Sequence, residues 1–99
     1  MTDKRIKKPV DSQAAQAQRD TFYKAVVSGE LSVGQAVAAM RKISRLTQPE
    51  FAAHRGISVQ ALRQIESSTG NPTLDTLNKI SAIFGLQVGF VPKARARTP

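Results

Sequence analysis

Four helix-start signals follow one another closely in this chain, and they limit its fold more than any other feature. Ser32-Val33-Gly34-Gln35 and Thr47-Gln48-Pro49-Glu50 have the form of capping boxes, in which a hydroxyl and the side chain three residues later each satisfy a free backbone amide. Ser58 and Thr73 are two further N-cap candidates. The sequence therefore predicts several short helices packed around one small core.

Apolar residues recur at three- and four-residue steps after each cap, which predicts one buried face per helix. A helix from Ser32 to about Arg45 and a helix ending near His54 come first. The buried face of the first comprises Val33, Ala36, Val37, Met40 and Ile43. Gly56 follows the second helix at a position that favours a positive φ, so a sharp turn is expected there.

The two later helices have equally clear faces. In a helix from Val59 to Ser67, Leu62 and Ile65 face inward, while Val59, Gln60, Arg63 and Gln64 face outward. A last helix begins after Thr73 and ends at Gly85. Its predicted core side comprises Leu74, Leu77, Ile80, Ser81 and Phe84.

The sequence outside this region suggests one further helix, a strand and two basic ends. Ser12–Ser28 is rich in alanine and ends before Gly29, which predicts a helix that packs on the core or on a partner. Leu86–Val91 alternates and is rich in β-formers, which predicts a short strand. We therefore expect a disordered basic arm (1–11), an N-terminal helix and turn (12–31), a helical domain with a C-terminal strand (32–91) and a basic tail (92–99).

The charge balance points to an anionic partner. Fifteen Lys and Arg against seven Asp and Glu give a net charge of +8, and DNA is the commonest partner of such proteins. The alternative is that basic termini only keep a small protein soluble. The basic ends are further candidates for contact with phosphates or for entry into the minor groove: Lys4, Arg5, Lys7 and Lys8 at one end, and Lys93, Arg95 and Arg97 at the other.

Several functional classes are not expected. The chain has no cysteine and one histidine, His54, which excludes a disulfide scaffold, a cysteine zinc site and a multi-histidine metal site. The missing cysteines also fit a reducing cytoplasm. No apolar run approaches the ~20 residues of a membrane span, and no apolar stretch follows the basic N-terminus as in a secretory signal. We expect no catalytic residues, no enzyme activity, no cofactor and no metal.

Two short capped helices that meet at a glycine turn have the geometry of a helix-turn-helix. Here they run from Gln48 to Glu66, and Ala52, four residues before Gly56, is small enough to let them approach closely. The second helix would then present its outer face to the major groove of DNA.

The residues of this region also resemble a known family. TQPEFAAHRGISVQALRQIESSTGNPTLDTLNKISAIFGL is similar to the helix-turn-helix domain of the phage Cro and repressor (XRE) family. The matching positions are Gln48, Ala52, Gly56, Ser58, Leu62, Ile65, Glu66, Pro72, Leu77, Ile80 and Leu86. ESSTGNPTLDTLNKISAIFGLQVGFVPK resembles the corresponding part of HipB-type antitoxins.

The resemblance implies an all-α, lambda-repressor-like domain of about five helices with a short C-terminal β-strand. That strand would pair with its copy in a homodimer, through Leu86, Gln87, Val88, Gly89, Phe90 and Val91. The two recognition helices of such a dimer would lie about 34 Å apart and read a palindromic operator. The implied protein is a cytoplasmic, nucleoid-associated repressor of its own operon that binds a HipA-like kinase toxin.

Individual roles follow from the resemblance and from side-chain chemistry. Gln60 and Gln64 match base-contacting positions, and an amide can donate and accept at the edge of adenine. Arg63 faces the same way and suits guanine, while Val59 either touches a thymine methyl or packs. The predicted phosphate contacts are Gln48, Ser58 and Arg55, with Ser58 also a cap and Arg55 alternatively a solvated turn residue. Arg41 and Glu66 match a family ion pair.

Two alternatives remain open. One is a stand-alone repressor of a phage or metabolic operon that has no toxin. The other is an interaction protein that uses the same scaffold and binds an acidic partner without reading DNA.

Overall fold

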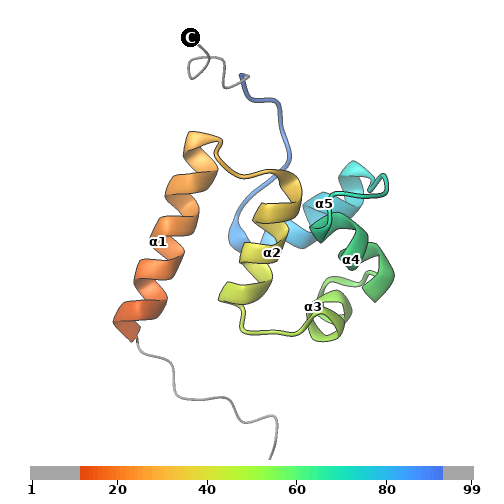
Figure 1. Ribbon diagram of the computed structural model, residues 1–99, viewed down its shortest axis with the longest axis horizontal. Coiled ribbons are helices and arrows are strands. Elements are labelled where there is room, and N and C mark those ends of the chain that lie inside the picture. The colour runs from red at the N-terminus through yellow and green to blue at the C-terminus, as the bar shows by residue number, and fades with distance from the viewer. Residues whose placement is uncertain (1–11, 93–99) are drawn as a thin grey trace, which may run out of the picture.

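The computed structural model describes residues 12–92, and this part of the chain contains five α-helices and one 3-10 turn. They are α1 (Ser12–Ser28), α2 (Val33–Ile43), α3 (Gln48–Arg55), α4 (Val59–Glu66), α5 (Leu74–Ser81) and η1 (Ala82–Phe84). Figure 1 shows α2 at the centre, with α1 on one side and α3, α4 and α5 on the other. The predicted all-α class with about five helices is confirmed for these residues.

The predicted caps set where the helices begin. Ser32 and Thr47 each form both hydrogen bonds of a capping box, while Ser58 and Thr73 each accept a backbone N–H three residues later. Helix α2 ends at Ile43, two residues earlier than predicted. It cannot continue to Arg45 because that residue has a left-handed backbone with φ 60°.

The core lies where α2 meets α4 and α5, and Phe51, Leu62 and Ile80 are fully buried in it. Two residues predicted to face the core do not. Val33 is 51% exposed and Leu74 is 66% exposed. Each is the first residue of its helix, so its side chain precedes the first turn that packs against a neighbour.

Helix α1 packs on the core through an aromatic cluster. The Phe22 side chain is 4% exposed and makes edge-on contacts with the rings of Tyr23 and Phe84. The Tyr23 hydroxyl donates to the Phe84 carbonyl at 2.8 Å. The open question about α1 is thus answered for the single chain, because the helix covers the core beside α2 and η1.

The segment after Gly85 has no regular secondary structure and runs along the helical body. The Ser81 hydroxyl donates to the Leu86 carbonyl at 3.0 Å, and the Val88 amide donates to Asn78 Oδ1 at 2.9 Å. Within residues 12–92 no strand is formed, so the predicted strand at 86–91 is not present in the single chain. A strand of this kind needs a partner for its backbone groups, and the predicted partner is a second subunit.

The predicted basic arm (1–11) and nearly all of the basic tail (93–99) lie outside the described residues. None of the helices described is both long and apolar enough to cross a membrane.

Candidate functional site

The predicted helix-turn-helix is formed by α3, α4 and the turn between them. Gly56 ends α3 with φ 71°, and its amide donates to the carbonyls of Ala52 and Ala53. The Ala52 side chain is 2% exposed, which places its methyl group in the core beside α4. Ser58 then starts α4 by accepting the Ala61 amide at 3.0 Å. The two helices are therefore held at a fixed angle by local sequence.

Helix α4 has one buried face and one exposed polar face. Leu62 and Ile65 are 0% and 4% exposed, whereas Gln60, Arg63 and Gln64 are all exposed. The structure thus brings these three predicted base readers together on one solvent face. Val59 does not belong to that face: it is partly buried and packs against the core. The expectation that Val59 faces outward is therefore corrected, and the alternative that it packs is confirmed.

A chain of hydrogen bonds fixes α4 to α2 and α3. Arg41 forms a forked ion pair with Glu66, with Nε to Oε2 at 2.8 Å and Nη2 to Oε1 at 3.0 Å. Gln48 Nε2 donates to the same carboxylate at 3.1 Å, and Gln48 Oε1 accepts Arg63 Nε at 3.3 Å. The ion pair implied by the family resemblance is therefore present, and it extends to two predicted DNA contacts.

The electrostatics of this network favour its charged form. Burial raises the pKa of Glu66, but hydrogen bonds from Arg41 and Gln48 and the positive charges of Arg41 and Lys42 outweigh it, so the pKa lies below its ordinary value. The hydrogen bond to Glu66 raises the pKa of Arg41, against the opposing effect of burial. Both side chains are mostly buried, at 18% exposed for Arg41 and 10% for Glu66. The pair is therefore a structural clamp that joins α2 to the end of α4.

Gly34 makes a contact that the sequence analysis missed. A Cβ at this position would lie 2.6 Å from the Ile65 carbonyl oxygen and 3.0 Å from the Glu66 carbonyl oxygen. No side chain fits there, so α2 and the end of α4 approach to backbone contact. A glycine inside a capping box at the start of a helix, where it lowers helix propensity, was the available signal.

Arg55 does not lie in the turn between the two helices, where it was predicted. It is the last residue of α3 rather than a turn residue, and its side chain is 8% exposed. Its Nε donates to the Ile80 carbonyl at 3.3 Å, and its guanidinium lies 4.3 Å from the centre of the Phe51 ring. Burial lowers its pKa. The interpretation as a phosphate-contacting or solvated residue is wrong, and Arg55 joins α3 to α5.

The remaining predicted site residues lie on α3 or at the start of α4. Ser58 is exposed and its hydroxyl caps α4, while Gln48, at the first position of α3, is partly buried. His54 lies exposed on α3. Between residues 12 and 92, no group of three or more His, Cys, Asp or Glu side chains could hold a metal ion.

Comparison with known proteins agrees with this geometry. The sequence profile described as helix-turn-helix matches residues 37–91, more than half of the chain. Over 61 residues, the chain is 36% identical to the immunity repressor protein of Bacillus phage phi105. This stretch covers 62% of the chain and 42% of that protein, so the chain spans about two fifths of its relative's length. No solved structure matches. Helix α1 lies outside the profile match.

Proposed function

The chain belongs to the XRE-type helix-turn-helix family, and from this premise we propose that it is a sequence-specific DNA-binding transcriptional repressor. The observation that carries the proposal is the outer face of α4. Gln60, Arg63 and Gln64 stand together in solvent there, on a helix whose angle is fixed by the Arg41–Glu66 ion pair. Amide and guanidinium groups are the side chains that read adenine and guanine in the major groove.

The phosphate contacts that accompany base reading would come from the edges of the same face. Gln48 at the first position of α3 and Ser58 at the start of α4 lie at helix N-termini, where the helix dipole favours a phosphate oxygen. Gln48 is also bonded to Arg63, so a phosphate held by Gln48 would align Arg63 with the groove.

The direct test is binding to DNA upstream of the protein's own gene, compared with a scrambled duplex. A Gln60→Ala, Gln64→Ala variant should lose about 30-fold or more in operator affinity, because each well-formed amide–adenine pair contributes about 1–3 kcal/mol. Its affinity for the scrambled duplex should not change. Gln16→Ala, on α1, is the matched control, since it removes an exposed amide outside the family domain.

The contrary result is that the wild-type protein binds both duplexes equally and loses affinity for both equally as salt is added. Such a result would show that the protein binds DNA only through its charge. The interaction-protein alternative would then replace this proposal.

We also propose that the repressor is a homodimer closed by the segment 86–91. Val88, Phe90 and Val91 are 37%, 107% and 72% exposed, which is unusual for apolar side chains next to a core. Val88 and Val91 line a groove of about 250 Å³ whose apolar wall also includes Val26, Leu31 and Val33. A second copy of the segment would cover this surface.

The bonding of Val88 suggests which backbone groups would pair. Its amide already donates to Asn78 of its own chain, and the amides of neighbouring residues in a strand point to the opposite edge. Gln87 and Gly89 would therefore face the partner. Gly89→Pro removes one such donor, whereas Gly89→Ala keeps it and a Cβ there meets nothing within 4 Å. Sedimentation should show a monomer for the first variant and a dimer for the second; a dimer for both would reject this pairing.

The finer proposal is that the chain is the antitoxin and autoregulator of a HipBA-like operon, with a HipA-like kinase toxin as its partner. It rests on the resemblance of residues 66–93 to HipB-type antitoxins. Co-expression with the product of the adjacent gene should give a stoichiometric complex that still binds the operator. An adjacent gene that encodes no kinase, or a product that does not co-purify, would favour the stand-alone repressor, the alternative that the phage immunity repressor supports.

A further inference from the structure

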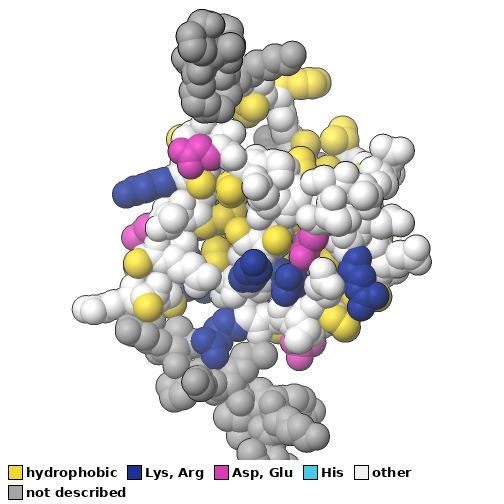
Figure 2. All heavy atoms as spheres, viewed as in Figure 1, with side chains coloured by type: hydrophobic (Ala, Val, Ile, Leu, Met, Phe, Trp, Pro, Cys, Tyr) yellow, Lys and Arg dark blue, Asp and Glu magenta, His cyan; other side chains and the backbone are white. Residues whose placement is uncertain are grey.

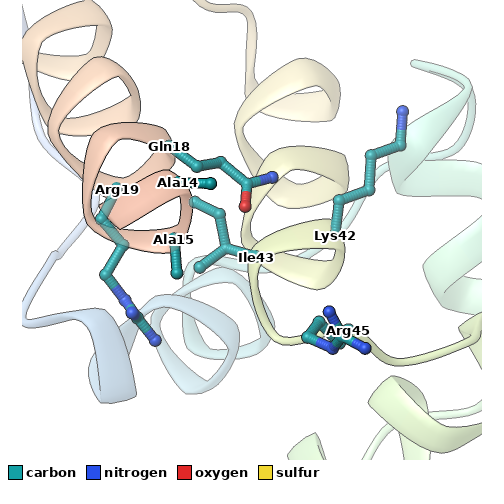
Figure 3. Close-up of a pocket in the computed structure, with 7 residues that line it drawn as sticks. All are labelled: Ala14, Ala15, Gln18, Arg19, Lys42, Ile43 and Arg45. Atoms are coloured by element: carbon teal, nitrogen blue, oxygen red, sulfur yellow. The ribbon is translucent and has the colours of Figure 1, made fainter. Parts of the chain in front are cut away.

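A hollow of about 470 Å³ lies between the first turns of α1 and the end of α2, outside the recognition helix. Ala15 and Ile43 form part of its wall, and three cations frame it: Arg19 from α1, Lys42 from the last turn of α2, and Arg45 just beyond α2. Figure 3 shows that these cations spread outward from the hollow instead of converging on one point. No acidic side chain is among the residues that line it.

The hollow is linked to the ion pair that holds α4, because Lys42 on its wall directly follows Arg41 in α2. Lys42 lines the hollow and is also close enough to Glu66 for its positive charge to lower the pKa of that carboxyl. Glu66 in turn accepts a hydrogen bond from Gln48, the predicted phosphate contact at the start of α3. Figure 2 shows Lys and Arg side chains spread across the face that α2 and α4 share.

We propose that this hollow is a second contact site for DNA phosphates, which extends the footprint of the helix-turn-helix onto α1. Separated cations suit a polyanion with charges at regular intervals better than they suit a single small anion. The inference rests on the proposed DNA-binding function. It assigns to α1, which lies outside the family match, a role in binding in addition to its packing on the core.

The test compares the salt dependence of DNA binding for wild type, Arg19→Gln, Lys42→Gln and the double variant. Each lost phosphate contact should lower the slope of log affinity against log salt concentration by about 0.9. The ratio of wild-type affinity to single-variant affinity should therefore change about 3.5-fold between about 50 and 200 mM salt. Lys24→Gln is the matched control, because Lys24 is an exposed cation on the same helix that does not line the hollow. It should behave as wild type.

The comparison is made on both operator and scrambled duplexes, so two failures can be told apart. If wild type does not discriminate the operator, the proposed function fails, yet the slopes still report on the hollow because phosphate contact is independent of sequence. If wild type discriminates but the double variant keeps the wild-type slope, the second site is rejected. A third outcome is that inorganic phosphate, at constant ionic strength, displaces DNA from wild type but not from the double variant. The hollow would then be a pocket for a small anion, and the proposal that it extends the DNA footprint would be rejected.

Discussion

Removing the Glu66 carboxylate should destabilise the domain far more than removing an ordinary surface charge. Glu66→Ala removes two hydrogen bonds from Arg41 and one from Gln48. The mostly buried Arg41 then keeps its hydrogen bond to the Leu46 carbonyl, at 3.2 Å. Breaking one side of a buried pair costs about 3–5 kcal/mol. Because both side chains keep some solvent contact and Arg41 keeps that one acceptor, we expect a loss of about 2–3 kcal/mol.

Urea titration and thermal melting measure this loss. A change of about 2–3 kcal/mol corresponds to a fall of about 10–20 °C in melting temperature for a domain of this size. Lys79→Ala is the control, since its contact with Asp75 is a surface pair at 3.8 Å with both side chains more than half exposed. It should change stability by no more than about 0.5 kcal/mol. Equal small effects of the two variants would show that the Arg41–Glu66 clamp adds nothing to stability and would refute the argument.

The same pair predicts how stability depends on pH. The folded pKa of Glu66 lies below its ordinary value of 4.5, so the contribution of the clamp is fully present above that value. It is lost as the pH falls through the lower folded pKa. Glu66→Gln, which cannot ionise, should therefore lose less stability than wild type between neutral pH and pH 3. Identical acid profiles for the two proteins would contradict the assignment.

Three further variants test other contacts. Gly34→Ala should lower stability by about 1 kcal/mol, although alanine favours a helix, because its Cβ would lie 2.6 Å from a backbone oxygen; a stabilised variant in urea titration would disprove the close approach. Phe22→Ala should lower the free energy of unfolding by about 3–5 kcal/mol, because Phe22 is buried in the core. Val27→Ala is its control: Val27 is 87% exposed, so the loss should be about 0.5 kcal/mol or less. Equal melting temperatures of the two variants would show that Phe22 does not anchor α1. Arg55→Lys should lower the free energy of unfolding by about 1–2 kcal/mol, because an ammonium group cannot both lie on the Phe51 ring and bond the Ile80 carbonyl as a guanidinium does. An unchanged midpoint of urea unfolding would refute this prediction.

The helix starts could be predicted because the information is local. A hydroxyl at Ser32 or Thr47 and a Gln or Glu three residues later determine a capping box without any tertiary contact, and both boxes are present. Gly29 and Gly56 end α1 and α3 with positive φ for the same local reason. The polar outer face of α4 also follows from its own periodicity.

The errors arose where tertiary contacts decide the outcome. Arg55 was expected to contact phosphate or to lie solvated in a turn, but the carbonyl of Ile80, in the distant helix α5, accepts its hydrogen bond, and its guanidinium lies on the ring of Phe51, one turn earlier in α3. Gly34 contacts the end of α4; its place inside a capping box is an unusual local feature, but the local pattern does not show which distant backbone it meets. The segment 86–91 has the composition of a strand, yet its backbone groups need a partner that one chain does not supply.

The clamp also bears on how the recognition face would meet DNA. The Gln48 side-chain amide has two N–H donors. One of them bonds the Glu66 carboxylate, so the second could donate to a phosphate oxygen. Arg63 uses its Nε on Gln48, and none of its other nitrogens bonds a residue of the described part of the chain, so they remain for a base. Both side chains are thus held in place by bonds within the chain, and in the proposed DNA contacts this would reduce the entropy lost on binding. We therefore expect Glu66→Ala to weaken operator binding even under conditions in which the variant is fully folded.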